Sequence, residues 1–203
     1  MSKVVLWDVD TQVDFMRPEG KLYVPGADQV APAMARLVEG ARDAGIVHVA
    51  SADDHELTDP EISEVPDFRE TYPPHCLRGT RGARKVHETE QHDPVPVGLD
   101  PLPERWLRGR EFLILKKHFD VFTNPNTERL LELLDPEELI VFGVATDVCD
   151  DAAIRGFLER GRVVRFVEDA ARGLDEERVA ACTADWRNRG VELTTVDAVL
   201  SSL

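Results

Sequence analysis

The chain has 203 residues, a net charge of −15 at pH 7 and 42% hydrophobic residues, which suits one folded domain with a buried core. The acidic balance argues against nucleic acids and anionic membranes as partners, and no apolar stretch reaches the roughly 20 residues of a membrane span. The start of the chain lacks a signal-peptide pattern, and the three widely spaced cysteines form no disulfide framework, so we expect a cytoplasmic protein.

Hydrophobic periodicity predicts strands that alternate with helices. The expected strands are apolar runs, at residues 4–7, 46–50, 112–115, 139–144, 163–167 and 191–195. The expected helices carry apolar residues at helical spacing, at residues 27–44, 127–134, 147–160 and 175–188. This order predicts a three-layer α/β/α fold with a mostly parallel six-stranded sheet, in a single domain over residues 1–203.

Residues at about 51–107 interrupt the alternation. They are rich in Pro, Asp, Glu and His, and they show little periodicity. A long irregular stretch inside a compact domain usually has a function. We therefore interpret this segment as an insertion that binds a metal or a substrate.

Several reactive side chains follow directly after predicted strands. Asp10 follows the first strand, Asp53 and His55 follow the second, Lys116 the third and Cys149 the fourth. Because the carboxyl ends of parallel strands lie at one edge of a sheet, we expect these side chains to gather there. Cys149 also stands at a predicted helix start, where backbone N–H groups and the helix dipole would stabilise a thiolate.

Cys149 is therefore a candidate nucleophile. A thiol that attacks a carbonyl group needs a proton acceptor, a positive charge and hydrogen-bond donors for the oxyanion. The candidates for these roles are Asp10, Lys116 and the N–H groups of Ala145 and Cys149. Spacing alone leaves other roles open: a core cysteine, a helix-capping aspartate and a surface lysine.

Three segments, in this order, resemble the isochorismatase-like cysteine hydrolases. Residues 10–15 read Asp-Thr-Gln-Val-Asp-Phe and match the D-x-Q-x-D-F signature of that family. Residues 116–122 are similar to its lysine segment, in which an aromatic residue stands six positions after the lysine. Residues 143–149 are similar to its G-x-x-T-x-x-C nucleophile turn. The resemblance extends over residues 4 to about 170.

The resemblance implies a catalytic triad of Asp10, Lys116 and Cys149, which would hydrolyse a small amide through a thioester. It implies an oxyanion hole formed by the N–H groups of Ala145 and Cys149. It further implies a cis peptide between Val144 and Ala145, with Val144 beside the substrate. Family members commonly assemble, so a homo-oligomer is expected on that analogy alone.

The insertion resembles the nicotinamidase branch of the family. Residues 51–55 and 72–80 are similar to its metal-binding D-x-H and P-x-H-C segments. Carried over to this chain, the resemblance makes Asp53, His55 and His75 ligands of a divalent metal ion.

Glu61 or Glu64 is the candidate for a fourth ligand, directly or through water. Aspartate and histidine donors suit zinc, which we favour, and also iron or manganese. The alternative is a loop network of these residues without a metal. His87 and His92 are interpreted as ordinary loop histidines.

Phe15 and Tyr72 match positions where nicotinamidases hold aromatic rings against the pyridine. The resemblance therefore makes nicotinamide the leading substrate, hydrolysed to nicotinate and ammonia. Core packing is the alternative role of Phe15, and Tyr72 stands where those enzymes often have Trp. Two rival functions are an amidase or carbamoyl hydrolase with another small substrate, and a non-catalytic small-molecule binding protein on the same scaffold.

Asp150 departs from the family pattern, which has a small apolar residue after the nucleophile. A carboxylate beside the thiol would raise the pKa of Cys149 and oppose thiolate formation. We expect the Asp150 side chain to point outward on the first helical turn, where it would interact favourably with the helix dipole, as would Asp147 and Asp151.

Overall fold

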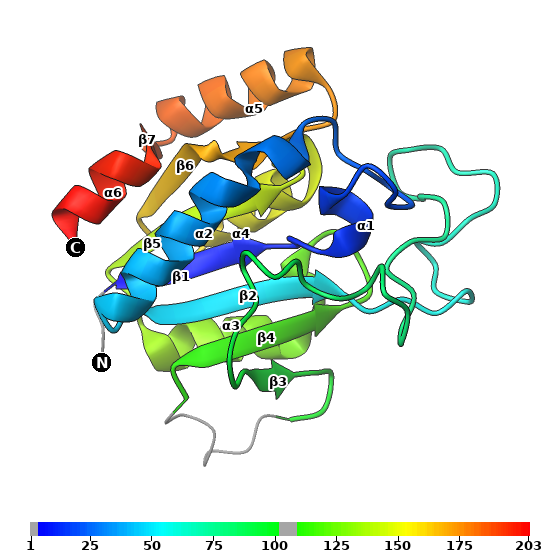
Figure 1. Ribbon diagram of the computed structural model, residues 1–203, viewed down its shortest axis with the longest axis horizontal. Coiled ribbons are helices and arrows are strands. Elements are labelled where there is room, and N and C mark those ends of the chain that lie inside the picture. The colour runs from blue at the N-terminus through cyan, green and yellow to red at the C-terminus, as the bar shows by residue number, and fades with distance from the viewer. Residues whose placement is uncertain (1–3, 102–108) are drawn as a thin grey trace.

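The computed structural model describes residues 4–101 and 109–203, which form a parallel sheet between two layers of helices (Figure 1). The strand order is β3-β4-β2-β1-β5-β6-β7, and every pairing is parallel. The strands are β1 (Val4–Val9), β2 (Val47–Asp53), β3 (Val95–Val97), β4 (Glu111–Lys116), β5 (Glu138–Val144), β6 (Val164–Arg172) and β7 (Glu192–Thr194). The predicted three-layer α/β fold is confirmed, with seven strands instead of six.

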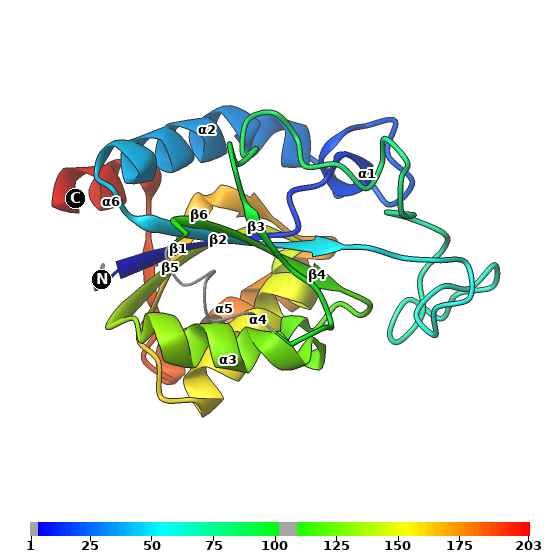
Figure 2. The same cartoon turned by 90° about the horizontal axis from the view of Figure 1, so that it is seen from below.

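Helices cover both faces of the sheet, as the edge-on view of Figure 2 shows. One face carries α1 (Val13–Met16), α2 (Ala27–Asp43) and α6 (Val196–Ser202), and the other carries α3 (Pro125–Leu134), α4 (Asp151–Glu159) and α5 (Glu176–Asn188). Each face has its own hydrophobic core, because successive side chains of a strand point to opposite sides. Leu6 and Trp7 of β1 accordingly belong to different cores.

β3 is the strand that the sequence pattern does not indicate. It is only 3 residues long, and Pro96 stands at its centre. Proline lacks the N–H group that an interior strand needs, and β3 accordingly forms an edge of the sheet beside β4. It lies inside the predicted insertion; residues 102–107 of that insertion and residues 1–3 of the predicted domain lie outside the described residues.

The segment after β5 differs from the prediction in its helical geometry. The helix expected at residues 147–160 begins as a π-helical turn, η3 (Thr146–Asp150), and continues as α4. β6 extends beyond its predicted apolar core to Arg172. A short 3-10 turn, η2 (Val121–Thr123), precedes α3. Among the described residues, no helix has both the length and the hydropathy that crossing a membrane requires.

The carboxyl ends of four strands bring the reactive residues together at one end of the sheet. Asp10 follows β1, Asp53 ends β2, Lys116 ends β4, and Cys149 lies in η3 just beyond β5. Asp53 and Lys116 are register partners on neighbouring strands. The part of the insertion that follows β2 lies at this same end of the sheet, at the right of Figure 1, whereas a later part runs back to β3 at the edge of the sheet.

Candidate active site

Lys116 is the centre of a buried group of charges at this carboxyl end of the sheet. Its Nζ lies 2.8 Å from Asp10 Oδ2 and 2.5 Å from Asp53 Oδ1, and all three side chains are at most 1% exposed. Ser51 donates a hydrogen bond of 2.7 Å to Asp10 Oδ1. Burial would lower the pKa of Lys116, but the two carboxylates hold it well above its usual value. Lys116 is therefore a buried ammonium ion and not a surface charge.

Two polar residues of the first turn position the neighbouring segments. Gln12 accepts a hydrogen bond of 2.7 Å from the N–H of Asp53 and donates one of 2.8 Å to its carbonyl oxygen. Asp14 accepts hydrogen bonds from the N–H groups of Cys76, at 2.7 Å, and Lys21, at 3.0 Å. The signature that contains both residues thus also fixes the end of β2 and the insertion, a role that the motif alone does not reveal.

Cys149 is a buried thiol, 7% exposed, near enough to the Asp10 carboxyl group for that group to affect its pKa. Burial raises the pKa of Cys149 well above its usual value; Lys116 opposes this shift and Asp10 adds to it. Burial of Cys149 therefore opposes the stabilisation of a thiolate that is expected from the helix start. Burial also raises the pKa of Asp10, against the attraction of Lys116, which makes Asp10 a better proton acceptor.

A cavity opens at the thiol; the space free of protein atoms there is about 330 Å³, part of which is open solvent. Cys149 and Ala145 line it together with Asp53, Glu61 and His75. The other lining residues are apolar or aromatic: Phe15, Leu22, Val24, Tyr72, Phe119, Val148 and Leu174. Within the described part of the chain, no lysine or arginine lines this cavity.

Two of the three residues predicted to contact substrate line the cavity. Phe15 and Tyr72 do, whereas Val144 is fully buried in the core and does not. The Val144–Ala145 peptide is cis, as expected, and Ala145 is the residue of this pair that lines the cavity. The remaining apolar wall comes from scattered segments, so no motif in the sequence could have identified it.

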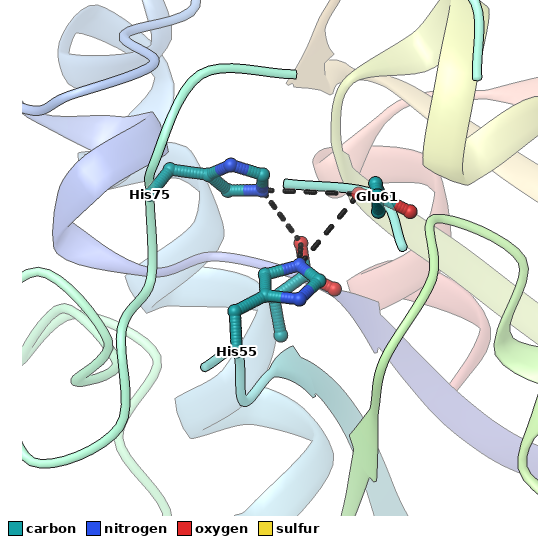
Figure 3. Close-up of side chains that lie close together, drawn as sticks. His55, Glu61 and His75 are labelled. Carbon is teal, nitrogen blue, oxygen red and sulfur yellow. Dashed lines mark ion pairs between the residues drawn. The ribbon is translucent and has the colours of Figure 1, made fainter. Parts of the chain in front are cut away.

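Four buried side chains from β2 and the insertion form a cluster beside Asp10 and Lys116. Asp53, His55, Glu61 and His75 each offer one ligand atom, and these atoms lie within 4.8 Å of one another. His75 Nε2 lies 3.4 Å from Asp53 Oδ2, and His55 Nε2 lies 3.6 Å from Glu61 Oε1. Figure 3 shows the two imidazole rings and the Glu61 carboxylate directed toward one point.

The donor chemistry of this cluster suits a divalent cation. Two imidazole nitrogens and two carboxylate oxygens are ligands that zinc, iron and manganese accept. His55 is fully buried, and neither of its ring nitrogens makes a hydrogen bond with a described residue, which is costly unless another group binds it. Burial would lower the pKa of His55, but Asp53 and Glu61 raise it to about 9, a sign of strong negative potential.

Of the two candidates for a fourth ligand, Glu61 belongs to the cluster, while Glu64 is exposed. Glu61 is also anchored from behind, because its Oε2 accepts a hydrogen bond of 2.6 Å from the N–H of Phe119. The two histidines interpreted as loop residues, His87 and His92, are both exposed and lie outside the cluster.

The sequence as a whole matches the family model described as Isochorismatase domain, over residues 4–198. The chain belongs to the isochorismatase domain family. A nicotinamidase/pyrazinamidase of Mycobacterium tuberculosis is 27% identical over 187 residues, which cover 91% of this chain and 95% of that protein. A protein of Arabidopsis thaliana named as a probable inactive nicotinamidase is 24% identical over 195 residues, which cover 93% and 90%.

The fold is shared with a pyrazinamidase of Pyrococcus horikoshii solved in complex with zinc. The TM-score is 0.76 at 24% identity, and the alignment covers 95% of this chain and 99% of that chain. The relatives make this isochorismatase-like chain a nicotinamidase-related member of its family.

Asp150 does not point outward, so the expectation for this member of the family is wrong. Its side chain is fully buried, and neither carboxyl oxygen has a hydrogen-bond partner of normal geometry among the described residues. It continues the buried side of α4, which includes Ile154 and Phe157. Burial raises the pKa of Asp150 well above its usual value, the charge of Asp10 raises it further, and Thr146 offsets this only in part.

Asp147, which was expected only to interact with the helix dipole, is also buried, and it connects the turn that carries Cys149 to a neighbouring loop. Its Oδ1 accepts a hydrogen bond of 2.8 Å from the N–H of Leu174, and its Oδ2 lies 3.3 Å from Arg178 Nε. Because Leu174 lines the cavity, Asp147 helps to shape it. Asp151 is only partly buried and accepts a hydrogen bond of 2.8 Å from Trp186 Nε1.

Asp150→Val is expected to stabilise the protein by about 1–3 kcal/mol, the usual cost of a buried polar group without a partner. The gain should be larger at pH 8 than at pH 5. The folded protein keeps the Asp150 proton that the unfolded chain releases above its ordinary pKa of about 4, so stability falls as pH rises toward the raised pKa. Urea unfolding at both pH values measures the effect.

Asp150→Asn is the matched control for this prediction. It keeps a polar side chain of the same size but cannot ionise. Its free energy of unfolding should therefore exceed that of the wild type only by the part of the gain that depends on pH. A loss of stability in both variants, equal at pH 5 and pH 8, would contradict the assignment of Asp150 as a buried neutral acid.

Proposed function

We propose that the protein is a metal-dependent cysteine amidohydrolase that cleaves the C–N bond of a small neutral amide, with nicotinamide as substrate and nicotinate and ammonia as products. The observation that carries this proposal is a single cavity lined by Cys149 and Ala145 and by three members of the metal cluster, Asp53, Glu61 and His75. A substrate in this cavity can contact the nucleophile and the cluster at once. Relatives named as nicotinamidases support the same function.

In this mechanism Asp10 takes the proton of the Cys149 thiol as sulfur attacks the amide carbon. The N–H groups of Ala145 and Cys149 donate hydrogen bonds to the oxyanion, and Lys116 holds the Asp10 carboxyl group in place. Asp10 then returns the proton to the leaving nitrogen, so that ammonia departs and a thioester remains. Asp10 next takes a proton from water, whose attack releases the carboxylate and restores the thiol.

Asp53, His55, Glu61 and His75 would hold the metal ion, and zinc is our first choice because the Pyrococcus pyrazinamidase was solved with it. Iron or manganese would fit the same donors. A bound divalent cation supplies a Lewis acid that can hold a ring nitrogen or a water molecule of the substrate complex.

The aromatic wall of the cavity suits a flat ring. The ring of Phe15 lies 5.3 Å from that of His75, and the ring of Tyr72 lies 6.3 Å from it, measured between centroids. Aromatic side chains at such spacing around a cavity favour planar ligands. Phe15 and Tyr72 therefore support a heteroaromatic amide over an aliphatic one.

The rival functions have less support. A carbamoyl hydrolase whose substrate carries a carboxylate would be favoured by a basic side chain in the cavity, and among the described lining residues there is no lysine or arginine. A non-catalytic binding protein would not need a buried ion pair of Lys116 and Asp10 near Cys149, although the Arabidopsis relative is named a probable inactive nicotinamidase.

The zinc-loaded protein is expected to release ammonia from nicotinamide, and benzamide is expected to react with a kcat/KM about 10- to 100-fold lower. Benzamide has the same size but lacks the ring nitrogen, so it loses one interaction with a charged partner, worth about 1.5–3 kcal/mol. An enzyme-coupled ammonia assay measures both rates. Equal rates would contradict a contact between the cluster and the ring nitrogen, and no turnover of nicotinamide would refute the substrate.

A further inference from the structure

We propose that Asp59 and Lys117 form a pair of positioning residues just outside the metal ligands. This pair orients the ring of His55 so that Nε2, and not Nδ1, binds the metal. This inference rests on the proposed function, because it presupposes that the cluster binds a metal. It goes beyond that function by assigning positioning roles to two residues that do not line the cavity. Asp59 lies outside all of the segments that resemble known motifs.

His55 presents its two ring nitrogens to carboxylates on opposite sides. Nε2 faces the cluster, 3.7 Å from Asp53 Oδ2 and 3.6 Å from Glu61 Oε1. Nδ1 lies 3.4 Å from Asp59 Oδ2, which does not belong to the cluster. A metal-bound imidazole is neutral and carries one proton, and the Asp59 carboxylate beside Nδ1 favours that proton on Nδ1. The lone pair of Nε2 is then free to bind a metal.

His75 has the same orientation for a different reason. Its Nδ1 lies 2.7 Å from the carbonyl oxygen of Pro73, which can only accept, so in this contact Nδ1 is the donor. Its Nε2 faces the cluster, 3.4 Å from Asp53 Oδ2. Metal-bound histidines generally donate through their other nitrogen to a carboxylate or a carbonyl oxygen. Two histidines from separate segments therefore share the geometry of metal ligands.

Asp59 is held in place by contacts of its own. Its Oδ2 accepts a hydrogen bond of 2.8 Å from the N–H of Glu56, and Lys117 Nζ lies 3.1 Å from the same oxygen. Lys117 also donates to the carbonyl oxygen of Asp54. Lys117 thus connects the end of β4 to the loop that carries Asp59, directly beside the lysine of the triad.

Asp59→Asn is expected to lower the affinity for zinc by about 10- to 100-fold, the usual effect of removing an outer partner of a metal-bound histidine. Metal-free wild-type and variant proteins are titrated with zinc in competition with a chromogenic chelator. Glu64→Gln is the matched control, because it removes the same charge from an exposed position of the same loop. Its affinity should stay within about twofold of the wild type, since the exposed charge is screened by solvent.

A zinc affinity of Asp59→Asn equal to that of the wild type would overturn the inference. Long-range ¹H–¹⁵N NMR of the zinc-loaded wild-type protein gives a test that does not depend on the folding of a variant. It should show a proton on Nδ1 of His55, and metal bound to Nδ1 would overturn the inference as well. Neither measurement requires turnover, so a wild-type protein that binds zinc but hydrolyses no nicotinamide would refute the proposed substrate alone.

Discussion

Cys149→Ala is expected to lower kcat for nicotinamide hydrolysis by a factor of about 10⁴ to 10⁶, as the loss of a covalent nucleophile does in other hydrolases. Without the sulfur atom no thioester can form, and Asp10 has no thiol to deprotonate. Ammonia release from zinc-loaded protein measures the loss. Mass spectrometry of acid-quenched reactions should find an acyl adduct on Cys149 of the wild type and none on the variant.

Cys182→Ala is the control for this prediction. Cys182 is partly buried on α5 and does not line the cavity, so its removal should leave kcat within about twofold of the wild type. Both variants should retain zinc binding, which shows that the site is still assembled. Full activity of Cys149→Ala would refute the thioester mechanism.

Lys116→Met is expected to destabilise the protein by about 3–5 kcal/mol, because it leaves two buried carboxylates without their shared cation. Asp10 and Asp53 are at most 2% exposed, and both contact the Lys116 ammonium group directly. The loss should be smaller at pH 5 than at pH 8, since protonation of one carboxyl group removes the repulsion that the missing cation leaves behind. Urea unfolding of the metal-free proteins at both pH values measures it.

Lys117→Met is the matched control, one residue along the chain. Lys117 is 27% exposed at its side chain and pairs with the partly exposed Asp59, so its loss should cost at most about 1 kcal/mol. Equal destabilisation by the two substitutions would contradict the special position of Lys116 between Asp10 and Asp53.

The sheet was predictable because its strands are buried on both faces and therefore appear in the sequence as continuous apolar runs. The gathering of Asp10, Asp53, Lys116 and Cys149 followed from one rule, that the carboxyl ends of parallel strands lie at the same end of the sheet. β3 was not predictable from periodicity, because Pro96 occupies the middle of a strand of three residues. Such a strand is tolerated only at an edge, and edge position is a tertiary property.

The side-chain directions and pKa shifts in the turn that carries Cys149 could not be predicted from the sequence. They depend on how deeply each side chain is buried and on which way it points from the helix axis. Asp150 was expected to face solvent on a regular helix, but the π-helical turn η3 precedes α4 and changes the direction of each side chain. The high pKa of Cys149 comes from burial, which local sequence does not specify. Val144 and Ala145 differ in exposure to the cavity although they are adjacent, and only the folded backbone decides between them.

Asp53 serves the triad and the metal cluster with different oxygen atoms. Its Oδ1 lies 2.5 Å from Lys116 Nζ, while its Oδ2 lies 3.4 Å from His75 Nε2. Substitutions at groups that share a partner do not have additive effects, so the kinetic defect of an Asp53 variant cannot be divided between the two centres. The paired ends of β2 and β4, which carry Asp53 and Lys116, are therefore where the two centres are joined, and neither centre could be moved to another scaffold without them.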